Sequence, residues 1–250
     1  MERTRIFRNS QIIILGLCIS AATIVSTLIL SKSLMQIKKF TNEVITVTGS
    51  AEKKILSDYS VWKVSFSRRA HELTKAFSSL NTDLLRVKTY LLGRGCTEQE
   101  IMISQVNTEI IFKRNRRGYS TNKIEGYSLS QTIEIRSWNV QKVMDISRSS
   151  TELINEGIEI ISNPPEFFYT KLSELKLEML AQATLDAKDR AEKMIQTTGN
   201  KIGKMRSAEM GVFQITPVNS YDVSSWGMND TSSLEKKVNA VIHAEFGIEE

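Results

Sequence analysis

One long amphipathic helix constrains the fold of this chain more than any other feature. Between Tyr169 and Gly199, apolar side chains recur at steps of three and four residues, which is the spacing of one helix face. The stripe comprises Leu172, Leu175, Met179, Ala183, Ala187, Ala191 and Met194. It stays apolar for about 40 Å, so the helix needs a sheet to lie on. Gly199 suits the left-handed conformation at which many helices end, and the pattern therefore predicts a helix over residues 170–199 that leads into a strand.

The rest of the chain alternates between strand and helix patterns. Apolar residues at every second position predict strands over 43–50, 62–66, 101–112, 127–136, 158–162, 202–213 and 238–246. The apolar phase changes near Ser104 and Gln105, which indicates a β-bulge there. Two shorter helices are predicted over residues 73–91 and 137–155, with Ser137 as the N-cap of the second. We therefore predict an α+β fold in which an antiparallel sheet is backed by amphipathic helices, including the long one at about 170–199.

An uncharged apolar run lies near the start of the chain. From Asn9 to Ser31 no residue carries a charge, and a helix of this length spans the hydrocarbon core of a bilayer, about 30 Å. The alternative is a cleaved signal peptide that releases a soluble periplasmic protein, because arginines precede the run and Ser31-Lys32-Ser33 has small residues at the cleavage spacing. The run is longer than the apolar part of most signal peptides, about 7 to 15 residues, and this favours one transmembrane helix.

These patterns divide the chain into four parts. They are a short basic N-terminus (1–10), a transmembrane anchor or uncleaved signal (11–31), a tether (32–42) and a folded domain (43–247). Basic residues flank both ends of the apolar run, so the charge difference that sets orientation is small. We expect a single-pass protein of the cell membrane, with the short N-terminus inside and the C-terminal domain on the periplasmic side.

The charges and cysteines exclude several classes of protein. Lys and Arg exceed Asp and Glu by 33 to 28, and the excess lies at the ends of the apolar run and in one loop. A nucleic-acid-binding face would spread such an excess over one surface, so we expect no nucleic acid partner. The two cysteines are Cys18, inside the apolar run, and Cys96. They cannot build a disulfide framework or a thiolate metal site.

Catalytic and metal-binding signatures are missing from the sequence. The two histidines, His71 and His243, lie outside any recognisable motif, although a hydrolase or transferase needs a positioned base. There is no H-x-x-x-H, no paired C-x-x-C and no D-x-D-x-D-G loop. We therefore expect a protein that is not an enzyme and that binds no metal or cofactor.

Two loops are candidates for interaction. The first runs from Lys113 to Gly126 and contains Arg114, Arg116 and Arg117. It could bind an anionic surface, polymer or lipid headgroup, or its charges could only keep a hairpin tip soluble.

The second runs from residue 214 to 232 and holds Tyr221, Trp226 and Met228 among Ser, Asn and Asp. This composition suits a protein interface, and the alternative is an ordered loop that folds back on its own sheet.

Cys96 is the candidate for redox chemistry. It is a lone thiol beside Gly95, and Arg94 is close enough in sequence to favour the thiolate. The alternative is a small side chain in a turn with no chemical role.

Several segments resemble the SIMPL-domain family. They are Thr46-Val-Thr-Gly49, Leu175-Lys-Leu-Glu-Met-Leu180, Ala187-Lys-Asp-Arg-Ala-Glu192, Gly199-Asn-Lys-Ile-Gly203, Gly211-Val-Phe-Gln-Ile-Thr-Pro217 and Asn229-Asp-Thr-Ser-Ser-Leu234. The resemblance covers about residues 43–247, and each motif is structural rather than chemical. It implies an exported bacterial envelope protein of α+β architecture that tends to self-associate, and bacterial relatives are often described as oxidative-stress defence proteins. It supplies no catalytic residues.

Two functions from different classes therefore compete. In the first, a membrane-anchored envelope domain acts by self-association or by binding another envelope protein, in oxidative-stress defence. In the second, the domain is an oxidant scavenger or oxidoreductase that uses Cys96. The scarcity of His and Cys favours the first.

Overall fold

The computed structural model describes the backbone of residues 3–249 and the side chains of residues 13–36 and 43–249. The chain divides into two compact units. Unit 1 contains the described residues of 1–51, 180–211 and 241–250, and unit 2 contains residues 52–179 and 212–240. Both mix helices with mainly antiparallel strands, so the predicted α+β class is confirmed.

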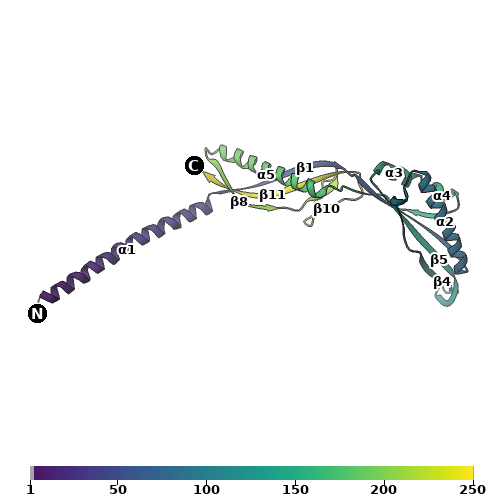
Figure 1. Cartoon of the computed structure of the whole chain (residues 1–250), viewed down its shortest axis with the longest axis horizontal. Coiled ribbons are helices and arrows are strands. Elements are labelled where there is room, and N and C mark those ends of the chain that lie inside the picture. Colours follow the sequence, from purple (N-terminus) through teal and green to yellow (C-terminus); the bar gives the residue numbers. More distant parts are fainter. Residues whose placement is uncertain (1–2, 250) are drawn as a thin grey trace. The chain divides into compact units, whose positions relative to one another are not determined.

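Helix α1 (Arg3–Asn42) is the first element of unit 1 (Figure 1). Its segment Ile13–Gln36 is long and apolar enough to cross a membrane, a test of length and composition that a signal sequence also passes. The hydroxyl groups of Ser20, Thr23 and Thr27 donate hydrogen bonds of 2.8 to 2.9 Å to carbonyls of the preceding helical turn. These polar groups therefore need no water, as a bilayer core requires.

The helix continues where the sequence predicted a tether. Residues 32–42 are helical to Asn42, and strand β1 (Val44–Leu56) begins almost at once. The physical reason is that this segment contains no Gly or Pro and is rich in Leu, Met, Gln and Lys, which are favourable in helices.

Unit 2 contains a six-stranded antiparallel sheet. Its strands are β2 (Tyr59–Ala70), β3 (Ile101–Ile103), β4 (Asn107–Arg114), β5 (Ser120–Ser137), β6 (Glu159–Ser162) and β7 (Glu166–Phe168). The order is β3-β5-β2-β6, with β4 also on β5 and β7 also on β2. Strand β2 pairs with β5 along its length, from Ser60 opposite Ser137 to Ala70 opposite Tyr127. The other four strands of the sheet all pair with β2 or β5, so these two long strands form its centre.

Helices cover one face of this sheet. They are α2 (Leu73–Gly93), the short 3-10 helix η1 (Glu98–Glu100), α3 (Val140–Ser149) and α4 (Glu152–Asn155). Trp62, Val64 and Phe66 of β2 are buried against helix residues such as Leu80 and Val143. The other face is polar and carries the 2.8 Å hydrogen bond between the hydroxyls of Ser65 and Thr132. The predicted alternation of apolar and polar residues is therefore confirmed in β2 and β5, which have one buried face and one open face. It is not confirmed over 101–112, where β3 and β4 are mostly exposed.

The predicted β-bulge also exists. Ile103 lies opposite Ile133, whereas Asn107 lies opposite Ser130, so β3 and β4 span one more residue than β5 does between the same points. The extra residue restores the phase, because Thr108 lies opposite the buried Leu129. The apolar pattern therefore changes phase at Ser104 and Gln105, while the residues before and after the bulge still face the same side of the sheet.

Long strands also border helix α5 (Leu172–Gln196). Strand β1 is a neighbour of β11 (Glu235–Glu249), which pairs antiparallel with β8 (Lys201–Met210) within unit 1. Within unit 2, β11 pairs antiparallel with β9 (Gln214–Pro217), and β9 pairs parallel with β10 (Met228–Asn229).

The apolar stripe of α5 is buried at every fourth residue. Its buried members are Leu175, Met179, Ala183, Ala187, Ala191 and Ile195. The prediction was wrong at its end, because Met194 is exposed and Ile195 completes the stripe. Gly199 has a φ of +81°, so the predicted left-handed residue beyond the helix end is confirmed.

Alanine and glycine bring α5 and β1 close together in unit 1. A Cβ atom placed on Gly49 would lie 2.6 Å from the Cβ of Ala187, which is closer than real side chains approach. The neighbouring Ser50 N–H donates a 2.8 Å hydrogen bond to Asp186 of the helix. Gly49 is therefore required by close packing, and no positive φ is involved.

Several further element boundaries differ from the predictions, and β1, β2, β5 and β11 are all longer than predicted. The helix predicted over 137–155 is two helices, α3 and α4, and Asn139 rather than Ser137 caps the first by accepting from Lys142 N–H at 3.0 Å. The loop predicted from Lys113 to Gly126 is mostly strand, with a short turn between β4 and β5. The strand predicted over 202–213 ends at Met210, and part of the loop predicted over 214–232 is β9 and β10. These strand pairings were not predicted from the sequence, because the paired residues are mostly polar and show no apolar alternation.

Candidate functional site: an ordered loop that presents aromatic side chains

The segment 218–227 of unit 2 joins the parallel strands β9 and β10. Met228 lies opposite Gln214, and Asn229 lies opposite Ile215. Two neighbouring parallel strands need a connection that returns to the same end, and residues 218–227 supply it as a loop. The loop is thus fixed at both ends by strand pairing.

Gln214 holds the middle of this loop. Its side-chain Nε2 donates a 2.6 Å hydrogen bond to the Ser224 carbonyl, and its Oε1 accepts a 3.3 Å bond from the Ser224 N–H. Gln214 is 8% exposed, so its buried side-chain amide forms hydrogen bonds with both the backbone N–H and the backbone carbonyl of Ser224. Gly227 turns the chain with a φ of +85° and donates its N–H to the Ser224 carbonyl at 3.1 Å.

The first half of the loop is ordered by short-range hydrogen bonds. The Ser220 N–H donates to the Pro217 carbonyl at 3.0 Å, and the Ser220 hydroxyl donates to Asp222 Oδ2 at 2.9 Å. The Asp222 N–H donates back to the Ser220 hydroxyl at 3.1 Å. These bonds are typical of serine and aspartate turns, which fix a loop without an apolar core.

A buried lysine secures the chain just after β10. Lys236 is 3% exposed, and its Nζ donates hydrogen bonds to the carbonyls of Phe167 and Asp230. The Phe167 N–H in turn donates to the Thr231 carbonyl at 2.7 Å. Burial lowers the pKa of the Lys236 ammonium, and Asp230 opposes this effect. The segment Asn229–Leu234 is therefore tied to both β7 and β11, which gives a structural role to one of the quoted sequence motifs.

The ordered loop exposes large apolar side chains. Tyr221 and Trp226 are each 93% exposed, and Val223 is 78% exposed. Lys237 Nζ lies 5.3 Å from the centroid of the Tyr221 ring, a cation-π distance that supports the ring on one side. A loop that only connected two strands would gain nothing by holding such groups in water. This arrangement is typical of a surface that binds another protein.

The structure separates the residues singled out from the sequence. Tyr221 and Trp226 lie on the loop, whereas Met228 belongs to β10 and is partly buried. Arg114 ends strand β4, and Arg116 and Arg117 lie in the turn that follows it. Gln214 and Val223 do not stand out in the sequence, because a polar residue in a short strand and a lone valine in a loop give no periodic signal.

Cys96 lies in the apolar core of unit 2. It is 4% exposed, and burial raises the pKa of its thiol. Glu100 also raises this pKa, while Lys142 lowers it. Arg94 does not face the thiol as a free cation, because it pairs with Glu152 and lies 5.2 Å from the Tyr90 ring centroid. These surroundings do not favour a reactive thiolate.

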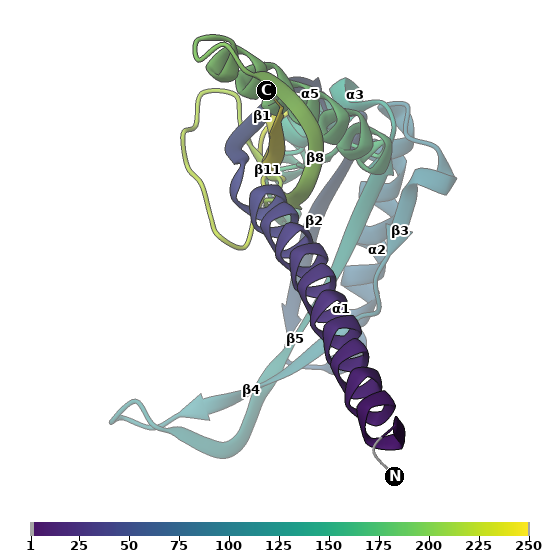
Figure 2. The ribbon, with the colours of Figure 1, turned by 90° about the vertical axis from the view of Figure 1, so that its left-hand side faces the viewer.

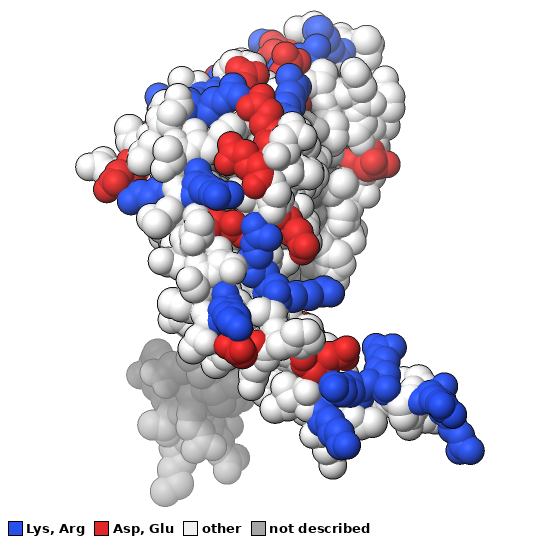
Figure 3. All heavy atoms as spheres, turned by 90° about the vertical axis from the view of Figure 1, so that its right-hand side faces the viewer, with Lys and Arg blue, Asp and Glu red and all other residues white. Residues whose placement is uncertain are grey.

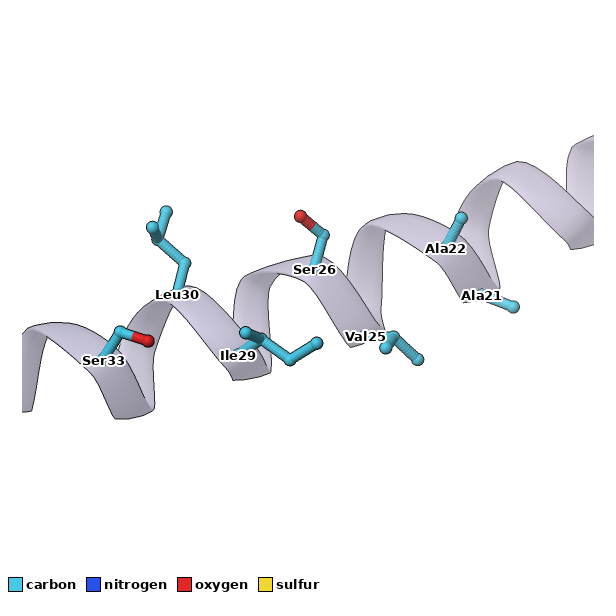
Figure 4. Close-up of a pocket in the computed structure, with 7 residues that line it drawn as sticks. All are labelled: Ala21, Ala22, Val25, Ser26, Ile29, Leu30 and Ser33. Carbon is cyan, nitrogen blue, oxygen red and sulfur yellow. The ribbon is translucent and has the colours of Figure 1, made fainter.

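A shallow apolar depression lies along the side of α1, and it is not a binding pocket. Figure 4 shows Ala22, Ser26 and Leu30 on one side of the helix and Val25 and Ile29 on another. All of its lining residues come from this single helix, so it is the flank of an exposed helix rather than a cavity.

The structure thus contains an α+β domain that follows a helix of membrane-spanning length and holds exposed aromatic side chains on an ordered loop. Comparison with known families identifies it further. A model of the SIMPL family, described as a protein of unknown function (DUF541), matches residues 45–246. The chain belongs to this family, so the predicted resemblance is confirmed. No curated protein matches the chain.

Proposed function

We propose that this chain is a membrane-anchored envelope protein whose SIMPL domain acts by self-association through the loop 218–227. Helix α1 is the anchor, and the domain lies on the periplasmic side. The observation that carries the proposal is the exposure of Tyr221, Val223 and Trp226 on a loop that hydrogen bonds hold in place. A preformed loop loses little conformational entropy on binding, and aromatic side chains supply large contact area.

Self-association is preferred to an unrelated protein partner for two reasons. The SIMPL resemblance implies a tendency to self-associate, and a symmetric pair brings the same loop from both copies into one contact. Two copies of three large side chains would then be buried together, which is how a small interface gains affinity. The role in oxidative-stress defence belongs to this proposal as the process that the assembly serves.

Oligomer mass tests the proposal directly. The full-length protein is purified in detergent, and its mass is measured by light scattering over a concentration series. We expect an assembly larger than the 28.3 kDa chain, after subtraction of the detergent. Replacing Tyr221 and Trp226 by Ser should weaken association roughly 100-fold or more, because two exposed aromatic anchors are removed.

Two further variants distinguish a specific loop from general stickiness. Trp138→Ser removes another exposed tryptophan of unit 2, which is 68% exposed, and should leave the mass unchanged. Gln214→Leu keeps all three apolar side chains but removes the bonds to Ser224, so it should weaken association by losing the preformed shape. A wild-type protein that stays monomeric at high micromolar concentration would refute self-association and point to a different protein as the partner.

A further inference from the structure

The β4–β5 hairpin of unit 2 has a compact, ordered tip. Figure 2 shows this two-stranded ribbon extending away from the helices of the unit. At the turn, Asn115 Oδ1 accepts hydrogen bonds of 3.0 Å from the N–H groups of Arg117 and Tyr119. Gly118 has a φ of +82°, and its N–H donates to the Asn115 carbonyl at 2.9 Å. The side chains of the tip are therefore displayed on a fixed backbone.

The hairpin concentrates positive charge. Residues 110–124 contain no Asp or Glu and carry the basic residues Lys113, Arg114, Arg116, Arg117 and Lys123. None of these five pairs with an acidic side chain among the residues that the structure describes. Figure 3 shows Lys and Arg side chains gathered along the projecting ribbon. Unpaired cations on a projection produce a local field that attracts an anionic surface.

Large apolar side chains lie among these charges. Ile110, Phe112 and Ile124 are 45%, 41% and 48% exposed, and Tyr119 at the turn is 69% exposed. Phe112 lies opposite Ile124 in the strand pairing, so the two side chains share one face of the ribbon. Charges alone would keep a hairpin tip soluble, and exposed Phe, Ile and Tyr side chains work against solubility.

We infer that this hairpin binds the headgroup layer of an anionic phospholipid membrane. Its Arg and Lys side chains contact lipid phosphates, and Phe112, Tyr119 and Ile124 enter the boundary between headgroups and acyl chains. A soluble polyanion would use the same cations but offers no apolar layer for these three side chains. Anchoring by α1, as proposed above, would tether the hairpin to a bilayer and raise the effective concentration of lipid. This inference does not depend on the loop 218–227.

Vesicle binding by the full-length protein tests the inference. The protein is reconstituted into nanodiscs of neutral phosphatidylcholine, and the discs are immobilised. Helix α1 is then already inserted in a bilayer and does not bind the vesicles. Vesicles of phosphatidylcholine, with or without phosphatidylglycerol, are passed over them and binding is measured by surface plasmon resonance. We expect binding only to the vesicles that contain phosphatidylglycerol, and weaker binding as salt is raised. Equal binding to both kinds of vesicle would overturn the inference.

Charge variants identify the hairpin as the binding element. Replacing Arg114, Arg116 and Arg117 by Ser should lower the apparent affinity roughly 100-fold, the effect of three basic residues at an anionic membrane surface. The matched control replaces Lys54, Lys188 and Lys204, which are also exposed, by Ser and changes the net charge equally. It should retain most of the binding. A control that loses as much affinity as the hairpin variant would show that only the net charge matters.

Apolar variants separate a lipid from a polyanion. Replacing Phe112, Tyr119 and Ile124 by Ser should weaken binding to the anionic vesicles at least roughly tenfold and leave binding to dextran sulfate unchanged. Thermal melting followed by circular dichroism checks folding, and Tyr119→Ser alone serves if the triple variant does not fold. Unchanged vesicle binding by the apolar variant would mean that the hairpin is a polyanion site and not a lipid site.

Discussion

At the scale of single residues, the packing of unit 1 depends on a missing side chain. Gly49 allows β1 to lie against Ala183 and Ala187 of α5, and alanines on the helix side keep the approach close. The sequence contains both halves of this contact in separate motifs. It gives no sign that they meet, because glycine in a strand is compatible with a bulge or a turn as well as with close packing.

Gly49→Ala should destabilise the protein by about 1 to 3 kcal/mol, because an added methyl group forces the strand and helix apart. The free energy of unfolding can be measured by chemical denaturation of the full-length protein in detergent. Gly93→Ala is the matched control, since the methyl group that it adds would meet no atom within 4 Å apart from its chain neighbours and the backbone of its own helix, and the φ of Gly93 is not positive. It should change the free energy of unfolding by less than about 1 kcal/mol. Equal effects of the two substitutions would contradict the packing explanation.

At the scale of elements, one carboxylate joins three segments of unit 2. Glu100 of η1 accepts hydrogen bonds from the Thr97 N–H at 2.8 Å and from Lys142 of α3 at 2.8 and 2.9 Å. The Ser137 hydroxyl at the end of β5 also donates to it. Burial raises the pKa of the Glu100 carboxyl, but the bonds from Lys142, Ser137 and Thr97 outweigh burial and lower the pKa to about 2.

Because the pKa of Glu100 is low, the free energy of unfolding should depend on pH in the acid range. A carboxyl whose pKa is lower in the folded state stabilises the protein fully above its unfolded pKa of 4.5 and loses this contribution as pH falls toward about 2. Glu100→Gln should therefore reduce the free energy of unfolding at pH 7 by on the order of 2 kcal/mol. The difference from the wild type should shrink as the pH is lowered from 5 toward 2, as measured by denaturation at several pH values. A difference that is independent of pH would rule out ionisation as the cause.

At the scale of the whole molecule, the described backbone passes from the apolar helix to the first strand of the domain with one residue between them. Helix α1 runs to Asn42 and β1 begins at Val44. The chain thus has a helix that suits a bilayer and a domain of the SIMPL family directly after it. This arrangement fits a membrane-anchored or exported protein.

Retention of α1 is the prediction at this scale. In cells, the protein should stay in the membrane fraction after alkaline extraction, and its intact mass should include residues 1–31. Replacing Ile24 and Leu28 by Arg should release it, because each arginine at the centre of a span costs about 2.5 to 3.5 kcal/mol. Replacing the same two residues by Ala is the control and should leave the protein in the membrane. A mature chain that begins near Ser33 would instead identify the segment as a cleaved signal.

The sequence by itself determined the class of fold, the long helix, the bulge near Ser104 and the apolar N-terminal segment. These features depend on local spacing and length, which are properties of neighbouring residues. Only the tertiary structure decided that Gly49 meets Ala187, that Gln214 holds Ser224 and that Cys96 is buried. It also decided that Phe112 is exposed, although its neighbours in sequence do not distinguish it from a core residue. Contacts between distant segments and the exposure of a side chain depend on how elements pack, and no local pattern encodes that packing.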